Sequence, residues 1–114
     1  MCNDLNTSLM EGAVVQISEI VAEKKTCELA IRNERHFIDP VSGAWKTAAS
    51  VFPAVVVGPV ADACLMYLKK GRRVRVVGRL KQYRWKDKDG HWSEKTCILA
   101  EHVEFAAAKE DKNA

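Results

Sequence analysis

The chain has 114 residues and a mass of 12.7 kDa, which suffices for one hydrophobic core and leaves no room for a second. Hydrophobic residues make up 47% and charged residues 29%, as in ordinary globular proteins, and a net charge of only +3 excludes a chain that is basic throughout. Because no apolar run is long enough to span a membrane and the start MCNDLNTSL does not resemble a signal peptide, we expect a cytoplasmic protein.

The first part of the chain predicts β-strands. Residues 5–20 are rich in Val and Ile and indicate one or two strands, with Gly12 as a bulge or bend. Residues 23–25 form a short polar turn. In the following CELAI, residues 27–31, apolar and more polar positions alternate, which predicts a half-buried strand.

A loop, a strand and a helix follow. We expect a loop at residues 32–43, because Asp-Pro and Ser-Gly are turn signals. The run VFPAVVV, residues 51–57, predicts a third strand, and Pro53 places it at a sheet edge or a bulge because proline cannot donate a ladder hydrogen bond. Residues 61–71 predict a helix that ends at Lys-Lys-Gly and covers one end of the sheet with its apolar stripe. The stripe consists of Ala61, Cys64, Leu65 and Leu68.

The last part of the chain predicts one long hairpin. Residues 72–85 form a strand, Asp-Gly within residues 87–90 is a strong hairpin signal, and residues 92–105 return as the partner strand. Strands, one short helix and a long hairpin in so short a chain predict an all-β protein with an OB-fold, a five-stranded Greek-key barrel with its helix between strands 3 and 4. We expect residues 1–105 to form this domain and residues 106–114 a polar C-terminal tail.

The long hairpin combines cations with aromatic rings. Between Lys69 and Lys95 basic residues far outnumber the acidic Asp87, Asp89 and Glu94. Since side chains alternate along a strand, Val74, Val76, Gly78 and Leu80 should face the barrel interior. The other face then carries Arg73, Arg75, Val77, Arg79, Lys81, Tyr83 and Trp85. Same-face side chains lie about 6.6 Å apart, close to the phosphate spacing of a partly extended strand, and aromatic rings can stack on bases of any identity.

The sequence gives little indication of a metal site or a catalytic site. Cys2, Cys27, Cys64 and Cys97 are widely scattered, and no histidine clusters with them, so we expect buried reduced thiols and no metal or cofactor. Asp87 and Asp89 could hold a metal in principle, but hairpin-turn chemistry explains them better. We therefore expect a protein that is not an enzyme.

A long motif links the chain to a known family. AxxCxxYLKKGxxVxVxGRLxxxxWxDxDG spans residues 61–90, AEHVEF follows it, and LAIRN and NTSLMEG extend the similarity toward the N-terminus. In these residues the chain resembles the bacterial single-stranded DNA-binding protein family, as a divergent member. The resemblance implies an OB-fold, a homodimer or homotetramer, nucleoid association, and sequence-independent binding of single-stranded DNA in replication, recombination or repair. It leaves open binding to RNA.

The resemblance also carries candidate site residues. Phe37 and Trp85 match stacking aromatics of the family, and Lys70, Lys81 and Arg84 match basic positions of its DNA path. We list as stacking candidates Phe37, Trp85, Tyr83, Trp92 and Trp45. We list as phosphate-contacting candidates Lys70, Arg73, Arg75, Arg79, Lys81, Arg84, Lys86, Lys88 and Arg35.

The third strand departs from the family pattern. Val51 and Val57 stand where aromatics are usual, and Pro53 and Pro59 replace basic residues. Two lost stacks would remove roughly 2–6 kcal/mol per subunit. We expect the chain to lack the acidic C-terminal tip by which the family recruits other proteins. An alternative is therefore an OB-fold protein-interaction module, a paralogue or primosome-like accessory subunit, with weak or no DNA binding.

Overall fold

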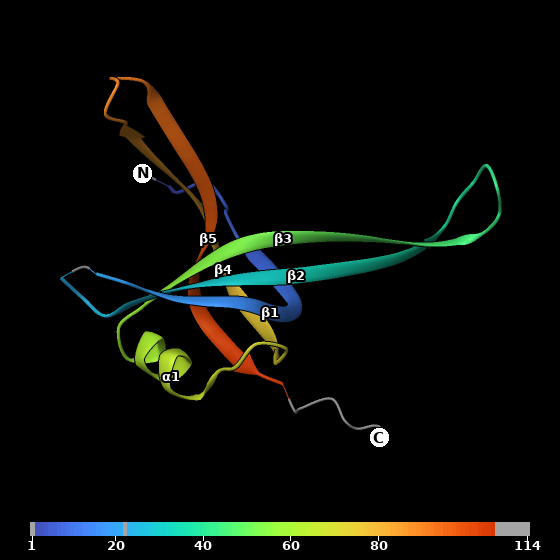
Figure 1. Cartoon of the computed structure of the whole chain (residues 1–114), viewed down its shortest axis with the longest axis horizontal. Coiled ribbons are helices and arrows are strands. Elements are labelled where there is room, and N and C mark those ends of the chain that lie inside the picture. Colours follow the sequence, from blue (N-terminus) through green and yellow to red (C-terminus); the bar gives the residue numbers. More distant parts are fainter. Residues whose placement is uncertain (1, 22, 107–114) are drawn as a thin grey trace.

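The structure is a computed structural model that describes residues 2–21 and 23–106. Five strands close into a barrel in the order β1-β2-β3-β5-β4, with one helix between β3 and β4 in the sequence (Figure 1). The elements are β1 (Ser8–Ile20), β2 (Thr26–Ile38), β3 (Trp45–Val57), α1 (Pro59–Tyr67), β4 (Arg73–Lys86) and β5 (Trp92–Phe105). This architecture confirms the predicted all-β class and the five-stranded OB barrel with its long β4–β5 hairpin.

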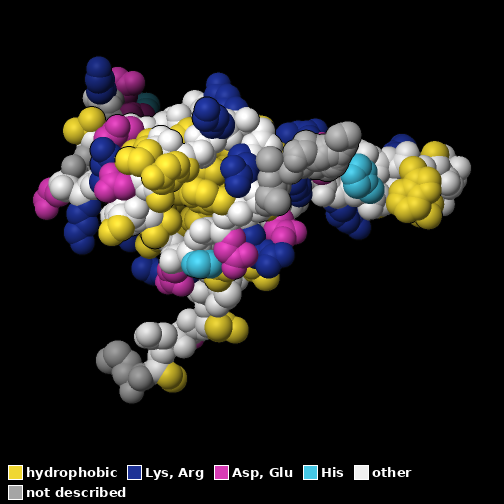
Figure 2. All heavy atoms as spheres, turned by 90° about the horizontal axis from the view of Figure 1, so that it is seen from below, with side chains coloured by type: hydrophobic (Ala, Val, Ile, Leu, Met, Phe, Trp, Pro, Cys, Tyr) yellow, Lys and Arg dark blue, Asp and Glu magenta, His cyan; other side chains and the backbone are white. Residues whose placement is uncertain are grey.

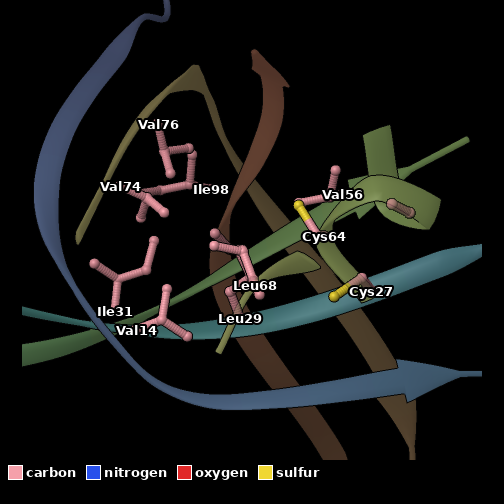
Figure 3. Packing of buried hydrophobic residues seen from close by; sticks show 12 residues of the cluster. Val14, Cys27, Leu29, Ile31, Val56, Cys64, Leu68, Val74, Val76 and Ile98 are labelled. Carbon is pink, nitrogen blue, oxygen red and sulfur yellow. The ribbon is translucent and has the colours of Figure 1, made fainter. Parts of the chain in front are cut away.

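The core lies inside the barrel and beneath the helix. The predicted helical stripe is confirmed, because Ala61, Cys64 and Leu68 are buried and Leu65 packs against them. Strand alternation supplies the rest, with Val74 and Val76 of β4 pointing inward as predicted (Figure 3). The buried cluster consists of Val14, Cys27, Leu29, Ile31, Ala54, Val56, Ala61, Cys64, Leu68, Val74, Val76 and Ile98.

The predicted loop at residues 32–43 is wrong in extent. Strand β2 continues to Ile38 and β3 begins at Trp45, and the two strands stay paired along their whole length. The turn signals act only within residues 39–44, where Asp39 Oδ1 accepts a hydrogen bond from the Val41 N–H (3.1 Å) and Gly43 has a φ of 74°. Turn residues therefore mark where this hairpin reverses but not where its strands end.

Two local predictions also need correction. Helix α1 ends at Tyr67, before the Lys-Lys pair, because Leu68 is already extended. Gly12 is not the bulge of β1, which lies between Val14 and Gln16. Gly12 instead permits a close approach, since a Cβ there would lie 2.5 Å from the Arg32 carbonyl oxygen. Among the described residues, no helix has the length and apolar character needed to cross a membrane.

The two long hairpins extend beyond the barrel as separate arms (Figure 1). Strand β4 pairs with β1 only as far as Gly78, so Leu80 leaves the barrel and is 52% exposed. The prediction that Leu80 faces the interior is therefore wrong. The side chain of Asn6 satisfies its backbone instead, donating to the Leu80 carbonyl (2.8 Å) and accepting from its N–H (2.9 Å).

Pro53 lies at a strand edge, as predicted. Strand β3 pairs with β5 only at Ala54 and Val55, so Pro53 has a ladder partner in β2 alone. Of the predicted tail, residues 106–114, all but Ala106 lie outside the described residues. The Ala106 N–H donates to the Arg73 carbonyl (2.9 Å).

Candidate nucleic-acid interface

An apolar groove lies where the β4–β5 arm meets the outer face of β2 and β3. Because Cys27 and Val56 point into the core, their neighbours along the strands point outward. The β4–β5 register then brings Tyr83 and Lys95 over them as a cross-strand pair. The groove has a volume of about 320 Å³ and is lined by Ile20, Thr26, Glu28, Val55, Val57, Tyr83, Lys95 and Cys97.

The rim of the groove is charged. Lys95 Nζ lies 2.6 Å from Glu28 Oε2, and Lys81 Nζ lies 5.4 Å from the centroid of the Tyr83 ring. Burial, together with a hydrogen bond to Cys97, raises the pKa of the Tyr83 hydroxyl, which therefore stays neutral. The groove thus combines an apolar floor and a neutral aromatic wall with two lysines at its edge, one of which is paired with Glu28.

The β4–β5 arm divides its cations and aromatic rings between two faces. Arg79, Lys81, Tyr83 and Trp85 share the side of the groove, which we call the groove face. Leu80, Gln82, Arg84 and Lys86 point the other way, together with Trp92 opposite Lys86, and form the rear face. The structure therefore brings Tyr83 and Trp85 together and separates them from Trp92.

The exposed tryptophans of this arm differ in their surroundings. Trp85 is 46% exposed, and no cation lies over its ring among the described residues. Over the Trp92 ring lie Arg84 Cζ at 5.7 Å and Lys86 Nζ at 5.3 Å. A base that stacks on Trp92 must compete with these cation–π contacts, whereas Trp85 is free of them.

The β2–β3 arm also divides its aromatic residues between two faces. Trp45, 72% exposed, lies on the outer face with Val51 and Val57, the face that leads into the groove. Phe37 lies on the opposite face, and Arg35 Cζ is 5.3 Å from its ring centroid. The two aromatic candidates of this arm therefore cannot serve one continuous stacking surface on a single side of the sheet.

Carboxylates compensate part of the predicted cationic ladder. Arg75 Nε donates to Glu11 Oε2 (2.8 Å), and Arg75 Nη1 lies 3.7 Å from Glu104 Oε1. Arg79 Nε lies 3.9 Å from Glu101 Oε2. Arg84 Nε likewise lies 3.9 Å from Glu94 Oε2. These pairs are exposed and individually weak, but they place negative charge beside three of the predicted phosphate contacts.

Acidic and basic side chains are interleaved on the face that carries α1 as well. Figure 2 shows hydrophobic side chains gathered over the body of the molecule, with both kinds of charge around them. Exposed apolar side chains of α1 include Val60, Met66 and Tyr67. This face is therefore not the uniformly basic surface that a polyanion would favour.

The remaining basic candidates are widely spaced. Lys70 lies in the turn after α1 and Arg73 begins β4, about 40 Å of strand from Trp85. Lys86 and Lys88 lie at the tip of the β4–β5 arm. Within the described part of the chain, these four residues form no ion pair. The cations nearest the groove are instead Lys81 and Lys95.

The acidic tip of the β4–β5 arm is explained by its turn. Asp87 Oδ1 accepts hydrogen bonds from the backbone N–H groups of Asp89 and His91, both at 2.9 Å. One potential metal-ligand atom from each of Asp87, Asp89 and His91 lies within 4.8 Å of the others, but all three side chains are exposed. Such an arrangement stabilises a hairpin turn and does not by itself make a metal site.

The thiols have the buried character that we predicted, with one exception. Cys27, Cys64 and Cys97 are buried and free, and Cys2 is exposed. Burial raises the pKa of Cys64 to about 11, with a smaller contribution from Cys27. Buried thiols with raised pKa values are poor nucleophiles, so they are packing residues in this barrel.

Sequence reasoning missed most of the groove. It included Lys95 in the basic region but not among the contact residues, it predicted Cys97 only as a buried thiol, and it assigned no role to Thr26 or Val55. The available signal was the hairpin register, since a three-residue loop that ends at Gly90 pairs Asp87 with His91 and thereby places Lys95 opposite Tyr83.

Comparisons with known proteins agree with this architecture. The profile of the single-strand binding protein family matches residues 5–106. Single-stranded DNA-binding protein 1 from Xylella fastidiosa is 34% identical over 59 residues, which cover 52% of this chain and 43% of that protein. The matched segment thus spans less than half of that relative.

Solved structures share the fold at low sequence identity. A Plasmodium falciparum SSB in complex with single-stranded DNA superposes with a TM-score of 0.83 at 21% identity, over 94% of this chain and 99% of that chain. A deletion mutant of the Thermus aquaticus single-stranded DNA binding protein has a TM-score of 0.78 at 21% identity, over 92% of this chain and 52% of that chain. The small single-stranded DNA-binding protein from Streptomyces coelicolor has a TM-score of 0.70 at 19% identity, over 94% of this chain and 98% of that chain.

Proposed function

The chain belongs to the single-strand binding protein family, and we propose on that premise that it binds single-stranded DNA without sequence preference. In this proposal the strand runs along the groove face, where bases stack on Trp85 and phosphates pair with Lys81, while Lys95 binds a phosphate only by leaving Glu28. The protein then acts in replication, recombination or repair, in the cytoplasm and associated with the nucleoid.

One observation carries the proposal: Trp85 and Lys81 lie on the same face of an arm that overhangs an apolar groove. A half-exposed ring over which no cation of the described residues lies can accept a base on its open side. Lys81 lies two positions from Tyr83 on the same face of β4, about 6.6 Å along the strand. This spacing is close to that of phosphates in a partly extended single strand, so each same-face position can meet one phosphate. Base-edge readout needs paired donors and acceptors, and the groove face offers few.

The other candidates take secondary roles. Trp45 extends the stacking surface along the outer face of β3. Phe37 and Trp92 meet the strand only where it passes around an arm. Arg75, Arg79 and Arg84 bind phosphates once these displace the neighbouring carboxylates, a cost offset by counterion release.

The protein acts as a binder rather than a catalyst in this proposal, and as a homodimer or homotetramer. Its five-stranded barrel buries only a small core, so pairing with further copies would add apolar burial. Exposed apolar residues on β1, such as Leu9 and Val15, are available for such contacts.

A comparison of single and double strands tests the proposal. The measurement is the fluorescence anisotropy of a labelled single-stranded oligonucleotide, set against its duplex of the same length. We expect tight binding to the single strand and at least tenfold weaker binding to the duplex, whose bases cannot stack on Trp85. No binding to either form would favour the protein-interaction module, for which Val51 and Val57 are the specific argument.

A further inference from the structure

The groove is a recess and not a flat platform. Its floor is formed by Val55, which is 8% exposed, and by Cys97, which is 2% exposed. Val57, 39% exposed, forms a wall at the end of β3. A stacking aromatic at position 57 would fill this space, whereas valine leaves it open to a ligand.

The lining restricts what such a ligand can be. Most of it is aliphatic, aromatic or thiol surface, and its polar side chains are largely engaged. The Thr26 hydroxyl donates to the Lys24 carbonyl (2.9 Å), and Glu28 is paired with Lys95. A ligand rich in polar edge atoms would lose hydrogen bonds on entry, so the groove favours a flat group with an apolar edge.

The mouth of the groove favours negative charge outside, on account of Lys81. Lys81 lies over the Tyr83 ring and forms no ion pair among the described residues, whereas Lys95 at the rim is paired with Glu28. Trp85 continues the same face, about 6.6 Å farther along the strand. The occupant is therefore a flat group that turns an apolar edge into the groove and is attached to an anionic chain that continues toward Trp85.

We propose that the groove is a slot for one pyrimidine base of a bound single strand, and that it favours thymine over uracil. This inference rests on the proposed function, and it adds a specificity that stacking alone would not give. The thymine methyl group is buried against Val55 and Val57, while the phosphates stay outside near Lys81. Burial of one methyl group corresponds to about fourfold tighter binding per occupied slot.

The test compares oligo-dT with oligo-dU of equal length, which have the same charge and differ only in the methyl group. Dissociation constants come from tryptophan fluorescence titrations at one salt concentration. The wild-type protein should bind oligo-dT at least about fourfold more tightly. Val57→Phe fills the slot, so its dT/dU ratio should fall close to one.

Matched variants separate the slot from general effects. Val60→Phe makes the same change on α1 at nearly the same exposure, 38% against 39%, and should keep the wild-type ratio. Thermal unfolding checks that Val57→Phe is folded. If it is not, Ile20→Phe at the other end of the slot, where Ile20 is 37% exposed, takes its place with the same expectation.

The outcomes are distinct. Equal binding of oligo-dT and oligo-dU by the wild-type protein overturns the slot and leaves the proposed function intact. A ratio that persists in Val57→Phe also overturns it, because the discrimination then arises elsewhere. Failure to bind either oligonucleotide overturns the proposed function itself.

Discussion

Replacement of Trp85 by alanine tests the groove face most specifically. The ring is 46% exposed with no cation over it among the described residues, so it can offer one open face to one base. One stack contributes about 1–3 kcal/mol, and its loss should weaken binding roughly 5- to 150-fold. Because the side chain lies outside the core, the free energy of unfolding should change by less than about 0.5 kcal/mol.

The assay is the anisotropy of a labelled oligo-dT titrated with each variant, with Trp92→Ala as the comparison on the rear face. The Trp92 ring already carries Arg84 and Lys86, so its loss should weaken binding less than fivefold. Refutation would come from a Trp85→Ala protein that binds like the wild type, or from a larger loss at Trp92. Either result would move the strand off the groove face.

Three further predictions concern charge, packing and pH. Glu101→Gln combined with Glu11→Gln should tighten oligo-dT binding at low salt and steepen its salt dependence, because Arg79 loses its carboxylate partner and Arg75 loses the nearer of its two. Unchanged titrations would show that these arginines do not meet phosphates. Gly78→Ala would place a Cβ 2.2 Å from the Leu99 carbonyl oxygen, so urea denaturation should show a loss of about 3 kcal/mol, and a loss below about 1 kcal/mol would contradict the β4–β5 bulge geometry. Burial raises the pKa of Cys64 from 9.0 to about 11, so above pH 9 the unfolded thiol ionises while the folded thiol stays neutral, and the free energy of unfolding should fall between pH 9 and pH 11. Cys64→Ala should flatten that decline, and an equal decline in both proteins would exclude Cys64 as its cause.

The barrel could be predicted because each of its elements has a local signal. Alternating apolar residues mark β2 and β4, the apolar stripe marks α1, and Asp-Gly fixes the β4–β5 turn. These signals do not depend on distant parts of the chain. The residues that carry the signals of α1, β4 and the Asp-Gly turn also belong to the long motif on which the family resemblance depends.

The arms and the groove could not be predicted in the same way. Leu80 has the alternation of an inward residue, but it is exposed because β1 stops pairing with β4 at Gly78. The groove forms only where β5 crosses β3 at Ala54 and Val55, a contact between segments far apart in sequence. Likewise, strand alternation indicates that Arg75 points outward, but not that Glu11 lies beside it.

The central claim is that the chain binds single-stranded DNA through the groove face. Its most direct test is a titration of the wild-type protein with oligo-dT, followed by tryptophan fluorescence at salt concentrations from about 50 to 200 mM. We expect quenching that saturates, with log K falling linearly against log salt at a slope of about −0.7 for each phosphate contacted. An unchanged tryptophan signal at the lowest salt concentration would contradict the account.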